Sequence, residues 1–230
     1  MASIYSGYKK AINLPDLSGN ALKVIAIISM VVDHFAYYLM EEGTMLYEVM
    51  RCFGRIAFPV FAFLIAEGFR YTRNRMRYFL QLLIFAIISE IPWYLLNGAD
   101  GTHNVMFTLA LGVVALATFE KLKKDGTLCC CVILLIAFIA IWSGVDYEWR
   151  GILVIVIFYL FGTSGKISFP FSRMMQLLCA FPLMMYYGIV GALLACMVLF
   201  MYDGARGFIQ GKVAKYGFYS FYPVHLFFFC

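Results

Sequence analysis

Long apolar runs separated by short polar turns dominate this sequence and restrict the folds open to it. Of its 230 residues, 63% are hydrophobic and 13% are charged, whereas an ordinary globular domain carries about a quarter charged residues. A helix that crosses a bilayer needs roughly 17 to 25 apolar residues, and run after run supplies a stretch of that order. The sequence therefore predicts an all-α, polytopic membrane helix bundle, in which residues 1–230 form one domain.

The hydrophobic runs and the polar breaks between them predict about nine transmembrane helices, within a range of eight to ten. Several of the runs are shorter than a full span, so that eight crossings also fit the pattern. The predicted helices cover residues 21–40, 49–70, 78–96, 105–119, 128–143, 150–163, 173–187, 188–201 and 216–230.

The distribution of basic residues gives a separate indication of topology, because Lys and Arg accumulate in cytoplasmic loops. With the N-terminus placed in the cytoplasm, fifteen of the eighteen Lys and Arg residues fall in inner segments. The outer segments hold only Arg51, Arg55 and Arg150. This alternation predicts nine spans with a cytoplasmic N-terminus. It also accounts for the net charge of +5, so no nucleic-acid partner is implied.

Ionisable side chains within the apolar runs indicate where function resides, because each is costly in lipid. Asp33 and His34 are adjacent in the first run, and Arg51 and Arg55 share one face of the second. His34 is a candidate general base, with Asp33 as the group that orients it. The alternative is that Asp33 forms a helix-packing ion pair with Arg51 or Arg55.

Further polar groups lie later in the chain. Glu67 is expected either to support a site or to pair with a nearby Arg. Glu90 precedes Pro92 in a segment that the proline should kink. Near the C-terminus, Tyr222 and His225 flank another proline. Four arginines, whose guanidinium groups match phosphate oxygens, follow the second run, and they also satisfy the topology rule alone: Arg70, Arg73, Arg75 and Arg77. No spacing typical of a metal site is present.

Five ordered blocks resemble the TraX family, which is named for the inner-membrane F-pilin N-acetylase. They read LSGNALKVIAIISMVVDHF, GRIAFPVFAFLIAEGFRYTRNR, SEIPWYL, DYEWRGILVIVIFYLF and FYSFYPVHLFFF, and they are spread over nearly the whole chain. The hydrophobic parts are weak evidence taken singly, but the ordered patterns MxxDH, GRxAFPxFxFxxxEGFxYT and YPxHL are specific. The resemblance implies an integral protein of the bacterial inner (plasma) membrane.

The resemblance also implies acyl transfer from acetyl-CoA or another acyl-CoA to an amine or hydroxyl. The acceptor would be a peptide, a sugar or a lipid. His34 would then be the base with Asp33 beside it, and the four arginines would bind the CoA phosphates. The residues expected to support substrate binding are Arg51, Arg55, Glu67, Glu90, Tyr222 and His225. No metal is expected.

Two other functions remain open on the sequence. In a proton-coupled transporter or exporter, the buried ionisable groups would form a proton relay: Asp33, His34, Glu67, Glu90 and His225. In a non-catalytic membrane assembly factor, the same charges would only pair helices.

Overall fold

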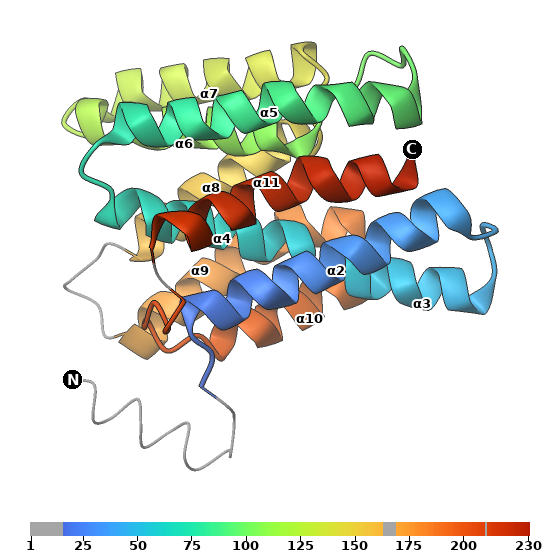
Figure 1. Cartoon of the computed structure of the whole chain (residues 1–230). Coiled ribbons are helices and arrows are strands. Elements are labelled where there is room, and N and C mark those ends of the chain that lie inside the picture. The colour runs from blue at the N-terminus through green and yellow to red at the C-terminus, as the bar shows by residue number, and fades with distance from the viewer. Residues whose placement is uncertain (1–15, 163–168, 210) are drawn as a thin grey trace. The chain divides into compact units, whose positions relative to one another are not determined.

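A computed structural model describes residues 16–162, 169–209 and 211–230 of the chain. Within these residues the regular structure is helical, and the only β-type pairings are two isolated bridges, Leu17 with Tyr202 and His103 with Val145. The helices, drawn in Figure 1, are α2 (Gly19–Leu39), α3 (Met45–Gly54), α4 (Ala57–Tyr71), α5 (Arg75–Asn97), α6 (Val105–Leu122), α7 (Gly126–Trp142), α8 (Glu148–Gly162), α9 (Phe169–Met184), the 3₁₀ turn η1 (Met185–Tyr187), α10 (Ile189–Phe200) and α11 (Lys212–Phe229).

The prediction of an all-α chain is confirmed over the described residues, and the predicted ranges match the helices to within a few residues with one exception. The predicted helix 49–70 falls within the apolar segment Met45–Tyr71. The structure divides this segment into two helices, α3 and α4, that part at Arg55 and Ile56. Pro59 explains the break, since a proline ring clashes with the carbonyl four residues earlier. The Ile56 N–H instead donates to the Phe53 carbonyl over 3.2 Å, which closes a tighter turn.

Nine crossings are not confirmed. In the described part of the chain, four segments are long and apolar enough to cross a membrane: Gly19–Leu39, Met45–Tyr71, Arg75–Asn97 and Val105–Leu122. Gly126–Trp142 and Ile189–Phe200 are apolar but shorter. Fewer segments qualify as membrane spans than the nine predicted, because several predicted runs form helices shorter than a full span requires. The chain is a membrane protein, and the bilayer crossing of its shorter helices stays a prediction.

Side-chain caps set where many of these helices begin. The Ser18 hydroxyl accepts from the Ala21 N–H at the start of α2, and Thr44 caps α3 by accepting from Tyr47. Asn74 and Asn104 cap α5 and α6 in the same manner, and Asp125 caps α7. Each cap satisfies a backbone donor that the first turn of a helix leaves without a partner. The polar breaks in the sequence are therefore helix-starting signals as well as loops.

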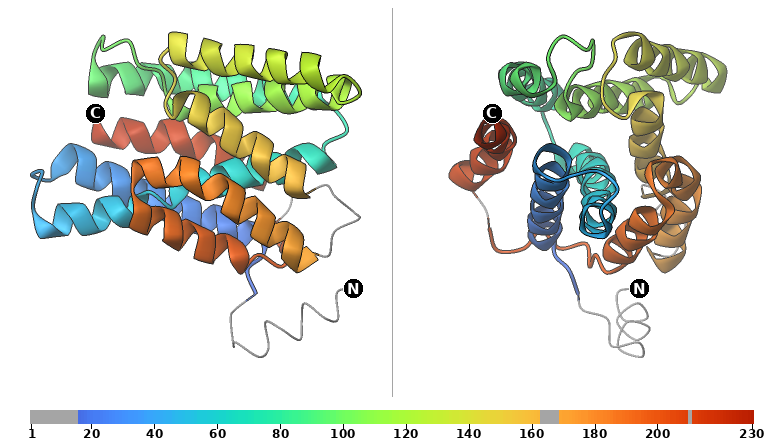
Figure 2. Two further views of the ribbon diagram at one scale, coloured as in Figure 1. Left: turned by 180° about the vertical axis from the view of Figure 1, so that it is seen from behind. Right: turned by 90° about the vertical axis from the view of Figure 1, so that its right-hand side faces the viewer.

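The chain divides into two compact units that alternate along the sequence. Unit 1 comprises residues 1–64 and 157–210, and unit 2 comprises residues 65–156 and 211–230. In unit 1, α3 packs against α2 and α10, and α10 packs against α9. In unit 2, α6 lies beside both α5 and α7, and α11 packs against α5, as Figure 1 and Figure 2 show.

Candidate functional site

The Asp33 carboxylate in unit 1 is bonded to Arg51, so α2 and α3 are joined by an ion pair. Arg51 Nη1 lies 2.6 Å from Asp33 Oδ2, and the two side chains are only 17% and 16% exposed. The Arg51 guanidinium also lies over the Tyr37 ring, 5.0 Å from its centroid. Arg55 contributes a second positive charge near Asp33. The sequence left open which arginine pairs with Asp33, and the structure gives this role to Arg51.

Two further contacts hold α2 close to α3. The Ser29 hydroxyl donates to the Phe53 carbonyl over 2.6 Å. A Cβ atom at Gly54 would overlap the Asp33 carboxylate, so only glycine permits this approach of the two helices. Arg55 follows directly and packs its side chain against Gly191 of α10. Arg55 therefore lies where α3 meets α10.

His34 is half-buried on α2, one residue beyond Asp33. Its ring meets the Tyr38 ring edge-on, with the centroids 5.8 Å apart. The expectation that Asp33 orients His34 does not match these contacts, because the described bond of the carboxylate goes to Arg51. Adjacent helical residues point about 100° apart, which lets Asp33 face α3 while His34 faces a different direction. The ion-pair alternative for Asp33 is confirmed.

Glu67 and Arg70 form an ion pair within α4, one helical turn apart. Glu67 is 9% exposed, and Arg70 Nη1 bonds to its carboxylate. Positions three apart share a helix face, so this pairing needs no other element. The pairing alternative for Glu67 is thus confirmed, and Arg70 is engaged with a carboxylate.

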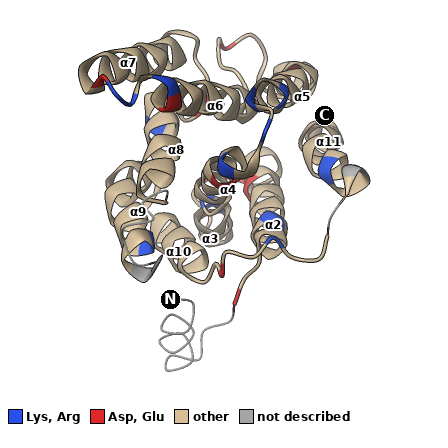
Figure 3. Cartoon of the chain, turned by 90° about the vertical axis from the view of Figure 1, so that its left-hand side faces the viewer, with Lys and Arg blue, Asp and Glu red and all other residues tan. Residues whose placement is uncertain are grey.

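The other three arginines of the run are exposed around the turn between α4 and α5. Arg75 lies over the Phe69 ring, 4.6 Å from its centroid, and its Nη2 lies 3.7 Å from a Glu120 carboxylate oxygen. The same carboxylate bonds to Lys123 over 3.1 Å. Glu120 therefore joins this turn to the α6–α7 turn. Lys and Arg residues gather along the chain at this end of unit 2 (Figure 3). We call the exposed group the basic turn: Arg73, Arg75, Arg77, Lys121, Lys123 and Lys124.

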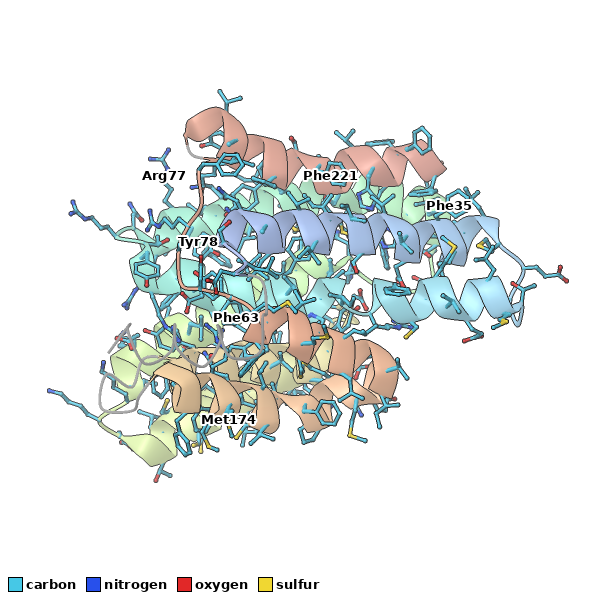
Figure 4. The ribbon with its side chains drawn as sticks, turned by 90° about the horizontal axis from the view of Figure 1, so that it is seen from below. Phe35, Phe63, Arg77, Tyr78, Met174 and Phe221 are labelled. Carbon is cyan, nitrogen blue, oxygen red and sulfur yellow. The ribbon has the colours of Figure 1, made fainter. Side chains whose placement is uncertain are left out.

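A polar network connects the first turns of α5 to α11. Arg77 and Tyr78 both lie at the start of α5 (Figure 4). One helical turn later, the Gln81 amide donates to the Tyr216 hydroxyl over 3.1 Å and accepts from Lys215 over 2.6 Å. Arg77 also lies beside the Tyr216 hydroxyl. Lys215 thereby adds a further positive charge close to the basic turn.

Glu90 is paired with a histidine at the other end of α5. One oxygen of Glu90 bonds to His103 Nδ1, and the other accepts from the Asn104 side-chain amide over 2.6 Å. His103 has no predicted role, because in the sequence it falls in a polar loop rather than an apolar run. The signal that would have found it is its position directly before Asn104, the cap residue that fixes this loop at the start of α6.

The loop before His103 has a turn of its own. The Thr102 N–H and hydroxyl both donate to Asp100, and these bonds hold the pKa of the exposed Asp100 carboxyl below its usual value. The Trp93 indole N–H in turn donates to the Thr102 carbonyl over 3.2 Å. These contacts order the loop between α5 and α6.

Tyr222 and His225 lie together on α11. Their rings are 5.4 Å apart between centroids, and the His225 ring is stacked on Phe221. Both residues are buried, and His225 Nδ1 lies 3.2 Å from the carbonyl oxygen of Phe221. Since a carbonyl only accepts, this contact places the ring proton on Nδ1. Tyr222 and His225 therefore have the contacts of buried residues packed on a helix.

Arg173, the first residue of the predicted helix 173–187, had no role in the predicted site. It lies within α9 and is 3% exposed. Its guanidinium lies against the rings of Phe63 and Tyr202, 4.4 and 5.2 Å from their centroids. One turn further along α9, the buried Gln176 amide donates to the Phe158 carbonyl. Arg173 is therefore a buried charge inside unit 1.

The predicted site residues fall in two groups. Unit 1 brings Asp33 together with Arg51, and it also contains His34 and Arg55. Within the described ranges 16–162, 169–209 and 211–230, no three His, Cys, Asp or Glu side chains gather closely enough to hold a metal ion. The remaining predicted residues belong to unit 2: Glu67, Arg70, Arg73, Arg75, Arg77, Glu90, Tyr222 and His225.

Comparison with known proteins places the chain in a family. The TraX protein family matches residues 18–230. The chain is 32% identical over 237 residues to a protein of Dichelobacter nodosus described as probable fimbrial assembly protein FimC, serogroup H1, covering 94% of this chain and 95% of that protein. It is 31% identical over 142 residues to an uncharacterised protein of Rickettsia prowazekii, covering 60% of this chain and 52% of that protein. No solved structure matches. The chain belongs to the TraX family.

Proposed function

We propose that this TraX family member is an acyltransferase of the bacterial inner membrane that moves an acyl group, most simply acetyl, from an acyl-CoA to an amine or hydroxyl. Two observations support the proposal. The family is named for a pilin N-acetylase. A relative that matches this chain over 95% of the relative's length is described as a probable fimbrial assembly protein. A pilin-type peptide is accordingly the first acceptor to test, ahead of a sugar or a lipid.

The basic turn is the single feature that carries the proposal on the donor side. Three arginines and three lysines are exposed around two neighbouring turns, with Glu120 as the carboxylate between them. Guanidinium groups bind phosphate oxygens with two parallel hydrogen bonds, and CoA carries several phosphates. Because Arg70 is engaged with Glu67, Arg73, Arg75 and Arg77 are the arginines proposed to hold the donor.

His34 is the proposed base in unit 1. A neutral imidazole has one ring nitrogen whose lone pair can take a proton, and the acceptor must lose one proton as its nitrogen or oxygen attacks the acyl carbon. The Arg51 guanidinium, held by Asp33, is proposed to favour the negative charge that develops on the acyl oxygen. Asp33 then positions Arg51 instead of His34.

Binding of acetyl-CoA to the detergent-purified protein tests the donor site. We compare wild type with Arg73→Gln/Arg75→Gln/Arg77→Gln. The control is Lys121→Gln/Lys123→Gln/Lys124→Gln, which removes the same charge beside the same Glu120. The wild type should bind acetyl-CoA saturably. If the arginine variant loses at least tenfold more affinity than the lysine variant, the guanidinium groups recognise the phosphates. Equal losses indicate general charge attraction, and no wild-type binding at millimolar donor rejects the proposed function.

Transfer itself is tested with radiolabelled acetyl-CoA and a peptide that has a free N-terminal amine. His34→Ala should lower the rate by about 100-fold or more, which is the usual contribution of a general base, while acetyl-CoA binding is retained. Unchanged transfer in this variant would remove His34 from the mechanism.

The transporter alternative has less support than it had from the sequence. Three of the carboxylates assigned to a proton relay are bonded to local basic partners, namely Asp33 to Arg51, Glu67 to Arg70 and Glu90 to His103. Flux that depends on a pH gradient in proteoliposomes, without affinity for acetyl-CoA, would favour the transporter.

A further inference from the structure

We propose that Lys215 and Tyr216, at the start of α11, form a second phosphate subsite beside the basic turn and that this subsite binds the 3′-phosphate of the CoA donor. The inference rests on the proposed function and deepens it, because it names the part of CoA that the protein distinguishes. The ribose of CoA carries a diphosphate at one position and a phosphate monoester at another. A protein that recognises both therefore offers two neighbouring groups of hydrogen-bond donors.

The buried side chain of Gln81 holds the two residues in place. Gln81 lies on α5 and is only 8% exposed. Its side-chain oxygen accepts from Lys215 Nζ over 2.6 Å, and its side-chain nitrogen donates to the Tyr216 hydroxyl over 3.1 Å. A lysine ammonium group only donates, so it must face the amide oxygen. One buried side chain of α5 thus positions two exposed side chains of α11.

These bonds use acceptors and leave donors exposed. The Gln81 oxygen takes one N–H of the Lys215 ammonium group, and the other N–H groups remain. The Tyr216 oxygen accepts from Gln81 and keeps its own O–H to donate. The Arg77 guanidinium, whose N–H groups all donate, lies beside the same hydroxyl. Donors that include two positively charged groups are therefore gathered at one place, which is the arrangement that a phosphate requires.

An aromatic ring supports Lys215 from one turn further along α11. Lys215 Nζ lies 5.9 Å from the centroid of the Tyr219 ring, within reach of a cation–π contact. The Tyr219 ring is itself stacked on Phe85 of α5, with the centroids 5.5 Å apart. A lysine that is held in place before the ligand arrives loses less side-chain freedom on binding. These contacts therefore favour binding by Lys215.

Local carboxylates do not neutralise this cluster. Arg75 lies near the Glu120 carboxylate. By contrast, no ion pair includes Arg77 or Lys215 within the part of the chain that the structure describes. Positive charge without a nearby carboxylate raises the local concentration of anions. The cluster thus has the electrostatics of an anion site rather than those of a structural ion pair.

Arg77 connects the cluster to the basic turn, because it belongs to both. It lies in the first turn of α5 (Figure 4), and α11 packs against α5 within unit 2. The basic turn and the start of α11 therefore lie at the same end of unit 2. One CoA molecule can contact both groups, with its diphosphate at the basic turn and its 3′-phosphate at Lys215 and Tyr216.

The same phosphate chemistry occurs in the headgroup of an anionic lipid. A lipid phosphate is a diester, whereas the 3′-phosphate of CoA is a monoester with three terminal oxygens and nearly two negative charges at neutral pH. A cluster that offers an ammonium group, a hydroxyl and a guanidinium group matches the monoester better. We therefore assign the subsite to the 3′-phosphate, and the experiment below distinguishes the two sources.

Acetyl-dephospho-CoA, which lacks only the 3′-phosphate, tests the subsite. Dissociation constants of this compound and of acetyl-CoA are measured for the detergent-purified protein. The wild type should bind acetyl-CoA about tenfold more tightly or better, which is the usual effect of hydrogen bonds to a charged group. Lys215→Gln should remove most of this preference by weakening acetyl-CoA binding alone. Tyr216→Phe should remove part of it.

Two further variants separate position from charge. Gln81→Leu keeps the charge of Lys215 but removes both bonds that position the cluster, so the preference for acetyl-CoA should fall severalfold. Lys124→Gln is the matched control, because it removes one positive charge from the basic turn. It should weaken both ligands by the same factor and leave the preference unchanged.

The outcomes separate this inference from the proposed function. Equal binding of both ligands by the wild type, or a preference that Lys215→Gln retains, overturns the 3′-phosphate subsite and leaves the acyl-CoA donor standing. If Lys215→Gln weakens binding of a short-chain phosphatidylglycerol and of neither CoA compound, the cluster binds lipid and the subsite is again overturned. A wild type that binds no acetyl-CoA overturns both proposals.

Discussion

Three carboxylates that the sequence places in apolar runs have a basic partner in the structure. Asp33 bonds to Arg51, Glu67 to Arg70 and Glu90 to His103. A lone charge near the centre of a bilayer costs about 3 kcal/mol or more, and the attraction of a nearby opposite charge offsets part of that cost. The cost of losing one partner is correspondingly larger than the gain from making the pair.

The Asp33–Arg51 pair can be measured directly. Asp33→Asn and Arg51→Gln should each destabilise the detergent-solubilised protein by about 2 kcal/mol, since each leaves a partly buried charge without its partner. The double variant should be less destabilised than the sum of the two, by at least 1 kcal/mol. Thermal unfolding followed by circular dichroism gives the values. Additive losses would show that the two charges do not interact.

Gly54 permits the close approach that makes this pair possible. Gly54→Ala should destabilise unit 1 by about 2 kcal/mol, because the new methyl group overlaps the Asp33 carboxylate. Gly217→Ala is the matched control, since a Cβ there meets nothing within 4 Å and alanine suits the interior of α11 better. A Gly54 variant as stable as the control would mean that the helices separate without cost.

At the scale of elements, the segment 201–209 after α10 is bound to the start of α2. The N–H groups of Gly19 and Asn20 donate to the carbonyls of Ala205 and Arg206, over 2.7 and 3.1 Å. The Asn20 amide donates to the Ile209 carbonyl over 3.0 Å. The first turn of α2 leaves several donors without helical partners, and this segment supplies the acceptors.

Two glycines in that segment give a matched pair of variants. Gly207 and Gly204 have similar positive φ values of 87° and 86°, but a Cβ at Gly207 would overlap Ser18 and Asn20, whereas one at Gly204 meets nothing within 4 Å. Gly204→Ala should cost about 1 kcal/mol from backbone strain. Gly207→Ala should cost at least 1 kcal/mol more. Limited proteolysis of the segment measures both, and equal cleavage rates would contradict the contact.

Sequence patterns predicted the helices well because each long apolar run has a clear polar end. Asn74, Asn104 and Asp125 are typical helix-starting residues and were read correctly as breaks. The split between α3 and α4 was missed because Pro59 acts on a carbonyl four residues away, within a run that no polar turn interrupts.

The site was harder to predict than the helices. That Asp33 needs a basic partner follows from its place in a span, but the choice of Arg51 depends on how α2 and α3 pack. Arg173 begins the predicted helix 173–187, but its burial could not be predicted because its aromatic neighbours, Phe63 and Tyr202, come from distant segments. His103 was overlooked because a search for charges inside apolar runs passes over a histidine at the end of a loop.

On the scale of the whole molecule, four consecutive segments are long enough to cross a bilayer. If each crosses once, the turns between them alternate between the two sides. The basic residues then place the turn at Arg73 on the cytoplasmic side, where acyl-CoA is made, and the loops near Glu41 and Asp100 on the opposite side.

Single cysteines introduced into a cysteine-free variant test this topology. Arg73→Cys in intact cells should resist a membrane-impermeant maleimide, whereas Glu42→Cys and Asp100→Cys should react. Inside-out vesicles should reverse the pattern. Labelling of all three positions from the same side would contradict at least one of the crossings, and labelling of Arg73→Cys from outside would invert the orientation.

The alternation of the two units along the chain has a consequence for biosynthesis. A ribosome that has made residues 1–64 has supplied only the first part of unit 1, and it then produces residues 65–156 of unit 2 before it returns to unit 1. Unit 1 is complete at residue 210 and unit 2 only when α11 has been made. Each unit therefore stays incomplete in the membrane until a segment that is translated much later has been made. A chain that stops before α11 leaves unit 2 incomplete.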